Sequence, residues 1–194
     1  MGDLPGQGQT SRANKGQIDD FNTYHENLLE WIKIANEYKI PTFVLGVGLG
    51  GLIVLNLLEK AELPIEGVML LSPMLELRRT GKGRKNKIIS NLGKMSKDTR
   101  FKVGISSQDL TRNEEIIDET DNDGLMLKKV TYRWYNLIVE KMKETMDHIK
   151  DIKQLPALIR YGTEDKILET DAIIELKDKL ASNELYFKAW NGLY

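Results

Sequence analysis

The stretch from Phe43 to Lys60 restricts the fold of this chain more than any other part of the sequence. It consists of an apolar run, a turn made mostly of glycine and a second apolar run, and it reads FVLGVGLGGLIVLNLLEK. A short, continuously apolar strand is typical of a parallel sheet that is buried on both faces. The stretch therefore predicts a buried strand, a tight turn and a helix over residues 51–60.

The segments on either side continue this alternation of helix and strand. Apolar residues recur at helical spacing within residues 18–38, at Phe21, Tyr24, Leu28, Trp31, Ile32 and Ala35. Buried strands are predicted within residues 65–73 and 155–165, a helix over 171–181, and a last strand within 184–192. An alternation of this kind indicates an α/β fold with a mostly parallel sheet.

The composition limits the classes of function. A length of 194 residues with 41% hydrophobic content fits one globular domain, and the net charge of -1 gives no field that attracts nucleic acid. The chain has no cysteine, which excludes disulfides and thiolate metal sites and is consistent with a cytoplasmic location. Because both ends are abrupt, we expect the fold to be incomplete at its N- and C-termini.

The alternation stops between residues 75 and 150, where no buried strand is evident. A helical pattern there passes through Val130, Trp134, Leu137 and Ile138. An insertion at the carboxyl edge of a sheet usually acts as a lid. We therefore predict a core from residues 1–74 and 151–194, with a helical cap insertion over 75–150.

Two charged runs lie inside this insertion. The first, residues 78–87, contains six basic side chains: Arg78, Arg79, Lys82, Arg84, Lys85 and Lys87. An exposed loop is the favoured interpretation, and peripheral contact with anionic lipid headgroups is the alternative. The second places Glu119, Asp121, Asp123 and Gly124 near the spacing of a calcium loop, but its twelfth position is Val130 instead of glutamate. A solvated polar turn is therefore preferred, and no metal is expected.

The glycine turn fits two kinds of site. Gly46, Gly48 and Gly51 match the G-x-G-x-x-G pattern that binds a dinucleotide pyrophosphate. That pattern needs an acidic residue at the end of the next strand, where this chain has Leu71, Ser72 and Pro73. A nucleophile elbow, G-x-S-x-G, needs small residues on both sides of the turn, which Gly46, Gly50 and Gly51 supply, but Gly48 stands where its serine would be.

Several motifs in one order resemble a known family. They are GDLPGQGQTSR, IDDFNTYHENLLEWI, PTFVLGVGLGGLIVL, LLSPML, TRNEEII with DNDGL, and YGTEDKIL. Together they resemble the lysophospholipase and monoacylglycerol-lipase branch of the α/β-hydrolases, which is serine-aminopeptidase-like and includes bacilysocin-type bacterial phospholipases. The resemblance implies an α/β-hydrolase fold with a helical cap, a carboxylic-ester hydrolase activity, a lipid or small acyl-ester ligand, and no cofactor.

The resemblance also assigns the elbow positions. The family sequence G-H-S-M-G-G corresponds to residues 46–51, so the nucleophilic serine falls on Gly48 and the preceding histidine on Val47. The backbone N–H of Leu49 takes the position of an oxyanion donor. Because glycine has no side chain, it cannot attack a carbonyl, and the acyl-enzyme route is closed at this position.

The acid of the family corresponds to Asp165, with Glu164 as the neighbouring alternative; a purely structural role, capping the turn before helix 171–181, also fits Asp165. The catalytic histidine of the family would follow a turn like the one at residues 192–194, but no histidine is present there. The two histidines of the chain are His25, predicted to be a surface or packing residue, and His148, at the end of the insertion helix.

Ser72 lies at a strand end but has no histidine partner, and a turn role is preferred for it. A serine–histidine–aspartate mechanism needs all three groups. We therefore expect a member of this hydrolase family that is inactive as given. A non-catalytic protein that binds acyl chains or lipids is the first alternative, and a nucleotide-binding oxidoreductase is the second.

Overall fold

The computed structural model describes residues 2–10, 13–78 and 96–193, which form two compact units. The sheet unit joins Tyr24–Leu77 to Val139–Tyr194, and the insertion unit joins Met1–Thr23 to Arg78–Ile138. The boundaries predicted from the sequence, at residues 75 and 150, stay a prediction.

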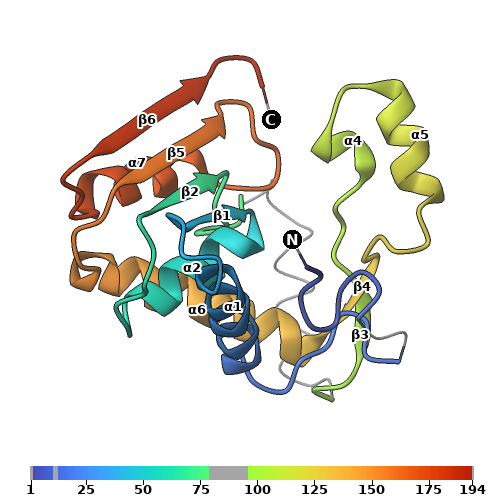
Figure 1. The fold of residues 1–194 in the computed structure, drawn as a ribbon. Coiled ribbons are helices and arrows are strands. Elements are labelled where there is room, and N and C mark those ends of the chain that lie inside the picture. Colours follow the sequence, from blue (N-terminus) through green and yellow to red (C-terminus); the bar gives the residue numbers. More distant parts are fainter. Residues whose placement is uncertain (1, 11–12, 79–95, 194) are drawn as a thin grey trace. The chain divides into compact units, whose positions relative to one another are not determined.

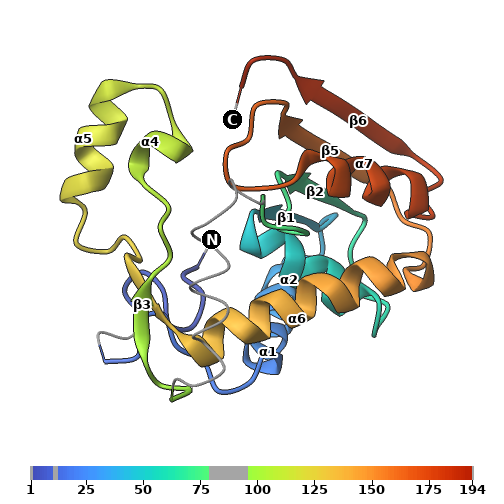
Figure 2. The same ribbon diagram turned by 180° about the vertical axis from the view of Figure 1, so that it is seen from behind.

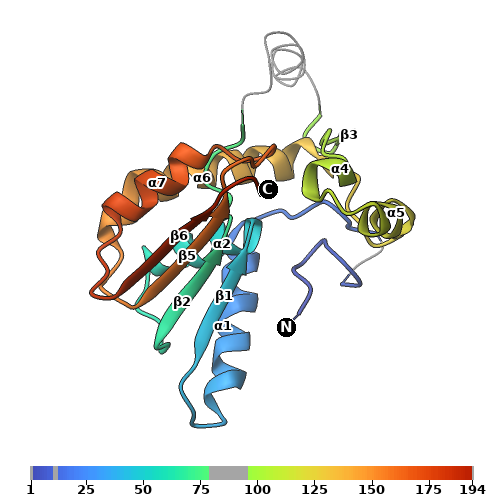
Figure 3. The same ribbon diagram turned by 90° about the horizontal axis from the view of Figure 1, so that it is seen from above.

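The sheet unit is built on four parallel strands (Figures 1 and 3). They are β1 (Phe43–Val47), β2 (Gly67–Leu71), β5 (Ala157–Gly162) and β6 (Leu185–Trp190). Their order in the sheet, β1-β2-β5-β6, follows their order in the chain. The α/β class and the parallel sheet that the sequence predicts are therefore confirmed.

Helices lie before and between these strands, since parallel pairing requires a crossover from each strand to the next. They are α1 (Asn22–Asn36), α2 (Leu49–Leu58), α6 (Tyr132–His148) and α7 (Thr170–Lys179), with a 3-10 turn, η1, at Ile149–Asp151. Helix α2 begins two residues before the predicted start, because it follows the turn at Gly48 directly. Figure 2 shows α2, α7 and the C-terminal part of α6 on one side of the sheet.

The core of the sheet unit lies between these helices and the sheet. Leu52, Leu55, Leu70, Ile159 and Leu176 are fully buried there.

The opposite face of β1 differs from the prediction. The apolar sequence of this strand predicts burial on both faces, yet Phe43, Leu45 and Val47 are 54%, 55% and 60% exposed. Burial alternates along the strand, with its even positions buried and its odd positions exposed, and Figure 2 shows the described helices α2 and α7 on one side of the sheet.

The part of the insertion unit that the structure describes contains a short antiparallel pair and two short helices. The strands are β3 (Arg100–Lys102) and β4 (Lys129–Thr131), and the helices are α4 (Ser107–Leu110) and α5 (Glu114–Asn122). The N-terminal loop is tied to β4, because the N–H of Gly16 donates to Gly6 and the N–H of Thr131 donates to Gly16.

Two predictions about the insertion were wrong. The polar segment expected to be a turn forms α5, and Glu119 and Asp121 of the rejected calcium loop lie on this helix. The Asn113 side chain caps the helix by accepting from two backbone N–H groups, and none of its residues is buried, so no apolar period marks it in the sequence. Val130, predicted as part of the long helix, belongs to β4.

Of the basic run at 78–87, all but Arg78 lies outside the described residues, so its contact with lipid headgroups stays a prediction. Within the described part of the chain, no helix combines the length and the apolar character needed to cross a bilayer.

Two leucines on neighbouring strands provide a test of this packing. Leu70 is fully buried, whereas Leu45 is 55% exposed. We expect Leu70→Ala to lower the free energy of unfolding by about 2–5 kcal/mol, since it leaves a cavity between sheet and helices. The matched change Leu45→Ala should cost far less. Chemical denaturation of both variants measures the difference, and equal losses would contradict the assignment of the core to the helix-covered face.

Candidate active site

The turn between β1 and α2 has the backbone conformation of a strained elbow. Gly48 has φ 52° and ψ −115°, a backbone conformation that residues other than glycine rarely adopt. The turn is fixed on both sides, because the N–H of Gly48 donates to Leu71 at 3.0 Å and the N–H of Met74 donates to Gly48 at 2.9 Å. The turn is thus locked to the end of β2.

Glycines at two neighbouring positions are required by packing. A Cβ atom on Gly46 would lie 2.7 Å from the Cα atom of Gly51, and a Cβ atom on Gly51 would lie 2.8 Å from the Cβ atom of Pro73. A Cβ atom on Gly48 or Gly50 would meet no atom of the described residues within 4 Å. A side chain at position 48 would therefore enter open space, and only the backbone conformation opposes it.

Leu49 is the first residue of α2. The first N–H groups of a helix have no partner within it, and the helix dipole makes this end favourable for negative charge. The N–H of Leu49 therefore lies at a helix end that favours negative charge, and its role as an oxyanion donor stays a proposal. Position 48 itself has no hydroxyl.

Asp165 lies in the turn after β5, with 8% of its surface exposed. Its Oδ1 atom accepts hydrogen bonds from the backbone N–H groups of Ile167 and Leu168, each at 2.8 Å. These bonds match the turn-capping role considered for this residue, and its role as a catalytic acid stays a proposal. Glu164 is exposed, and its backbone N–H donates to Leu193 at 2.9 Å.

These positions lie at one edge of the sheet. Gly48, Ser72 and Asp165 each follow the carboxyl end of a strand, and the three strands β1, β2 and β5 are parallel. The segments leaving β2 and β5 then run side by side, since Leu77 pairs with Leu168. Ser72 has a positive φ of 40°, and its N–H donates to the carbonyl of Arg160.

A hollow of about 330 Å³ opens at this edge of the sheet unit. It is lined by Leu71, Ser72, Arg160, Tyr161, Gly162, Trp190 and Leu193. Arg160 is held in place at this hollow, because its Nη1 atom donates to the carbonyl oxygen of Tyr186 at 2.8 Å. The hollow adjoins the elbow through Leu71, whose carbonyl accepts from Gly48. It offers an apolar wall with one fixed cation.

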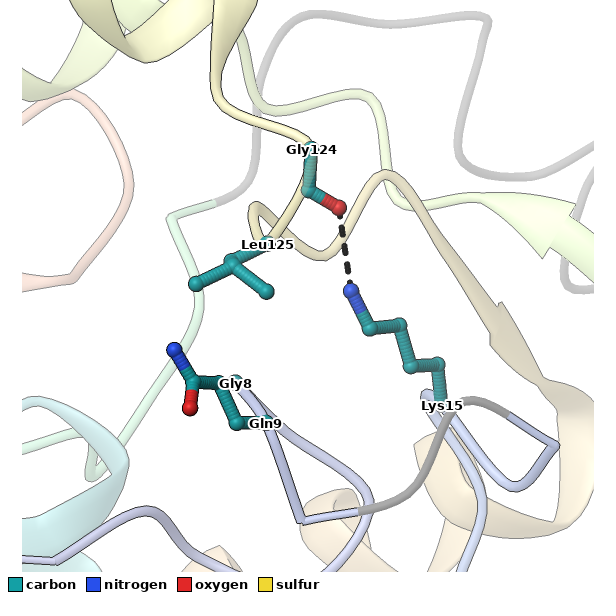
Figure 4. Close-up of a pocket in the computed structure, with 5 residues that line it drawn as sticks. All are labelled: Gly8, Gln9, Lys15, Gly124 and Leu125. Atoms are coloured by element: carbon teal, nitrogen blue, oxygen red, sulfur yellow. Dashed lines mark hydrogen bonds between the residues drawn. The ribbon is translucent and has the colours of Figure 1, made fainter.

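A larger hollow of about 730 Å³ lies in the insertion unit (Figure 4). It is lined by Gly8, Gln9, Lys15, Gly124 and Leu125, and Lys15 Nζ donates to the carbonyl of Gly124 at 3.0 Å. None of the predicted catalytic positions lines it, so its size does not identify it as the reaction site.

Neither histidine lies at the elbow. His25 is buried on α1 and makes a hydrogen bond with Asn56, which lies along α2 about 12 Å from Gly48 at 1.5 Å per residue. His148 is exposed at the end of α6 and contacts Asp151 at 2.9 Å. Among residues 2–10, 13–78 and 96–193, no group of three metal-binding side chains is placed to hold a metal ion.

Known structures share this fold. A monoacylglycerol lipase from Paleococcus ferrophilus superposes with a TM-score of 0.82 at 21% identity, covering 98% of this chain and 72% of that one. A monoglyceride lipase from Saccharomyces cerevisiae, solved with a substrate analogue, gives 0.85 at 20% identity, covering 98% and 67%. At these identities the likeness establishes the α/β-hydrolase fold.

Sequence comparison gives the family. Phospholipase YtpA from Bacillus subtilis (strain 168) is 31% identical over 195 residues, which cover 100% of this chain and 75% of that protein. The family described as serine aminopeptidase, S33, matches residues 1–194. The glycine turn, the parallel sheet and these matches agree, and the chain belongs to the serine aminopeptidase S33 family of α/β-hydrolases.

Proposed function

We propose that this chain binds lipid or other acyl-ester ligands on an α/β-hydrolase scaffold without cleaving them through a serine nucleophile. The relatives described above are named as a phospholipase, a monoacylglycerol lipase and a monoglyceride lipase, which supports the ligand class. The proposal needs no cofactor, since ester recognition and hydrolysis in this fold depend on side chains and backbone donors alone.

Gly48 is the observation that carries the proposal. The elbow keeps its positive φ, its two hydrogen bonds to the end of β2 and the open space above it, but it presents no hydroxyl. Nucleophilic catalysis needs an attacking atom and a base that activates it. Position 48 supplies neither, and both histidines lie elsewhere.

Leu49, at the oxyanion position, and Asp165, at the acid position, can belong to a site that binds a ligand without catalysing a reaction. The N–H of Leu49 and the N-terminus of α2 favour a carboxylate or an ester carbonyl, and the hollow beside the elbow offers Leu71, Trp190 and Leu193 to an acyl chain. A site built in this way binds the polar end of an acyl ligand at the elbow.

The dinucleotide alternative receives no support. The four described strands of the sheet unit follow chain order, so this part of the sheet has no point at which the strand order reverses. Dinucleotides bind at such a point in open α/β sheets. The glycines that match the dinucleotide pattern at this turn are explained by the close packing of β1, α2 and Pro73.

The first prediction concerns hydrolysis. We expect the purified chain to release no p-nitrophenol from p-nitrophenyl acetate or butyrate above the buffer rate, because position 48 has no nucleophile. An active serine esterase in the same buffer serves as the positive control. Turnover by this chain that disappears in Ser72→Ala would contradict the proposal and identify Ser72 as a relocated nucleophile.

The second prediction separates backbone strain from side-chain space at the elbow. Gly48→Ser should lower the free energy of unfolding by about 1–3 kcal/mol, since serine must adopt a positive φ that favours glycine. Gly50→Ser is the matched control: its Cβ atom also meets open space, but its φ is not positive, so it should cost little. We expect Gly48→Ser to remain inactive towards the same esters, because no base accompanies the new hydroxyl.

The third prediction concerns binding. A non-hydrolysable ether analogue of a monoacylglycerol should bind with an affinity measurable by isothermal titration calorimetry. Leu193→Asp should weaken binding at least tenfold, because it places a charge in the hollow, whereas Leu29→Asp, at an exposed leucine on α1, should not. Absence of binding to the unmodified chain, or equal effects of the two variants, would count against the proposed ligand site.

A further inference from the structure

A buried polar cluster joins α1, α2 and α6 in the sheet unit, towards the end of α2 that is remote from the elbow. Asn56 and Thr145 are fully buried, and Asn56 Nδ2 donates to Thr145 Oγ1 at 3.0 Å. His25, which is 6% exposed, makes a hydrogen bond with the same asparagine. One amide on α2 therefore links both neighbouring helices.

Charged groups surround this amide. Lys60 Nζ lies 3.0 Å from Glu144 Oε1 and donates to Asn56 Oδ1 at 3.2 Å, and Lys141 also pairs with Glu144. Partial burial by itself raises the pKa of Glu144, but hydrogen bonds from Lys141 and Lys60 outweigh this effect and bring the pKa to about 2. Glu144 is thus a stable anion held between two cations.

Glu59 has a different environment from Glu144. Its Oε2 atom accepts from Asn56 Nδ2 at 3.3 Å, whereas its Oε1 atom is buried without a hydrogen-bond partner among the described residues. A buried carboxylate that lacks full hydrogen bonding is costly, and protonation removes the cost. Burial first, with repulsion from Glu144, raises the pKa of Glu59 to about 7, although a hydrogen bond with Thr145 opposes the shift.

The pKa of His25 is shifted in the opposite direction to that of Glu59. Burial first, and then the charges of Lys60 and Lys141, lower the pKa of His25 to about 4, against the opposing effects of Glu144 and the Asn56 bond. His25 is therefore neutral near physiological pH.

The remaining titratable groups that face Glu59 are Lys60 on its own helix and His148 at the end of α6. His148 is exposed, and its hydrogen bond to Asp151 raises its pKa.

We propose that this cluster is a proton-linked clamp, in which uptake of one proton by Glu59 strengthens the joint between α1, α2 and α6. Helix α2 carries the elbow at its other end, so the clamp sets how firmly the helix that positions the elbow is held. The proposal concerns the folded scaffold and does not depend on which ligand the elbow binds.

The pH dependence follows from the direction of each shift. Glu59 binds its proton more tightly in the folded chain, so its stabilisation is complete below pH 4.5 and is lost as the pH rises through about 7. His25 acts in reverse: its contribution is complete above pH 6.5 and is lost as the pH falls through about 4. Between about pH 4.5 and 6.5 the two effects oppose each other, and removing either group should expose the other.

The test compares the unmodified chain with Glu59→Gln, which imitates the neutral acid. Equilibrium urea denaturation of both proteins is measured at intervals from pH 4.5 to 8. We expect the unfolding constant of the unmodified chain, relative to that of Glu59→Gln, to rise about a hundredfold across this range, the effect of a pKa that is raised from 4.5 to about 7 on folding. A constant ratio at all pH values would overturn the proposal.

The control variant is Glu62→Gln. Glu62 is exposed and pairs with Lys153 at 2.6 Å near the end of the same helix, so this change should leave the pH profile as it is. An equal pH effect of the two substitutions would assign the dependence to general charge and reject the clamp.

A measurement on the unmodified chain makes the test independent of the variants. Carbon-13 NMR of the glutamate carboxyl groups should show Glu59 titrating near pH 7, and the imidazole of His25 should show no protonation above pH 5. Titration of Glu59 near pH 4.5 would overturn the proposal even if Glu59→Gln failed to fold.

Discussion

The close approach of β1 and α2 is the constraint on which the rest of the site depends. The backbones meet where Gly46 faces Gly51, and Gly51 in turn packs against Pro73 after β2. Without a Cβ atom at these two positions the helix can follow the strand after a single residue and return across the sheet. That geometry directs the N-terminus of α2 to the carboxyl edge, and it places Gly48 in the strained conformation of an elbow.

The geometry of the elbow and its chemistry are carried by different atoms. Backbone hydrogen bonds from Gly48 to Leu71 and from Met74 to Gly48 hold the turn, and none of them involves a side chain at position 48. Glycine at position 48 therefore adopts the positive φ of the turn without the strain that another residue would carry.

Helix α2 is also fixed at its other end, by polar rather than apolar contacts. Asn56 reaches α6 through Thr145 and α1 through His25, and Glu59 is the member of this cluster whose charge is least compensated. A polar network in a low-dielectric interior specifies one arrangement of the helices, and it makes that arrangement sensitive to protons. The elbow thus sits on a helix that packing fixes at one end and a titratable network at the other.

Local sequence patterns were sufficient for the elements that bury apolar side chains. The strands β1, β2 and β5 and the helices α1, α2 and α7 were predicted because apolar runs and helical spacing record burial directly, whereas β6 was predicted as a strand although none of its residues is buried. The elbow was predicted because strand and helix crowd such a turn, so that small residues such as Gly46 and Gly51 are needed on both sides of it. Helix α5 was missed because it buries nothing, and its Asn113 cap with two following glutamates was the one available signal. The exposure of one face of β1 was not predicted, because an apolar strand sequence does not indicate whether other elements cover both of its faces.

The sequence by itself determined the fold class, the family resemblance and the absence of a hydroxyl at position 48, since each depends on residue identity and spacing along the chain. Only the tertiary structure decided that Gly48 keeps a positive φ with open space above it, and that Asp165 uses Oδ1 to hold its own turn. It also brought His25, Asn56, Glu59 and Glu144 together. They come from three helices, α1, α2 and α6, and burial and charge compensation between such groups exist only once the helices have packed.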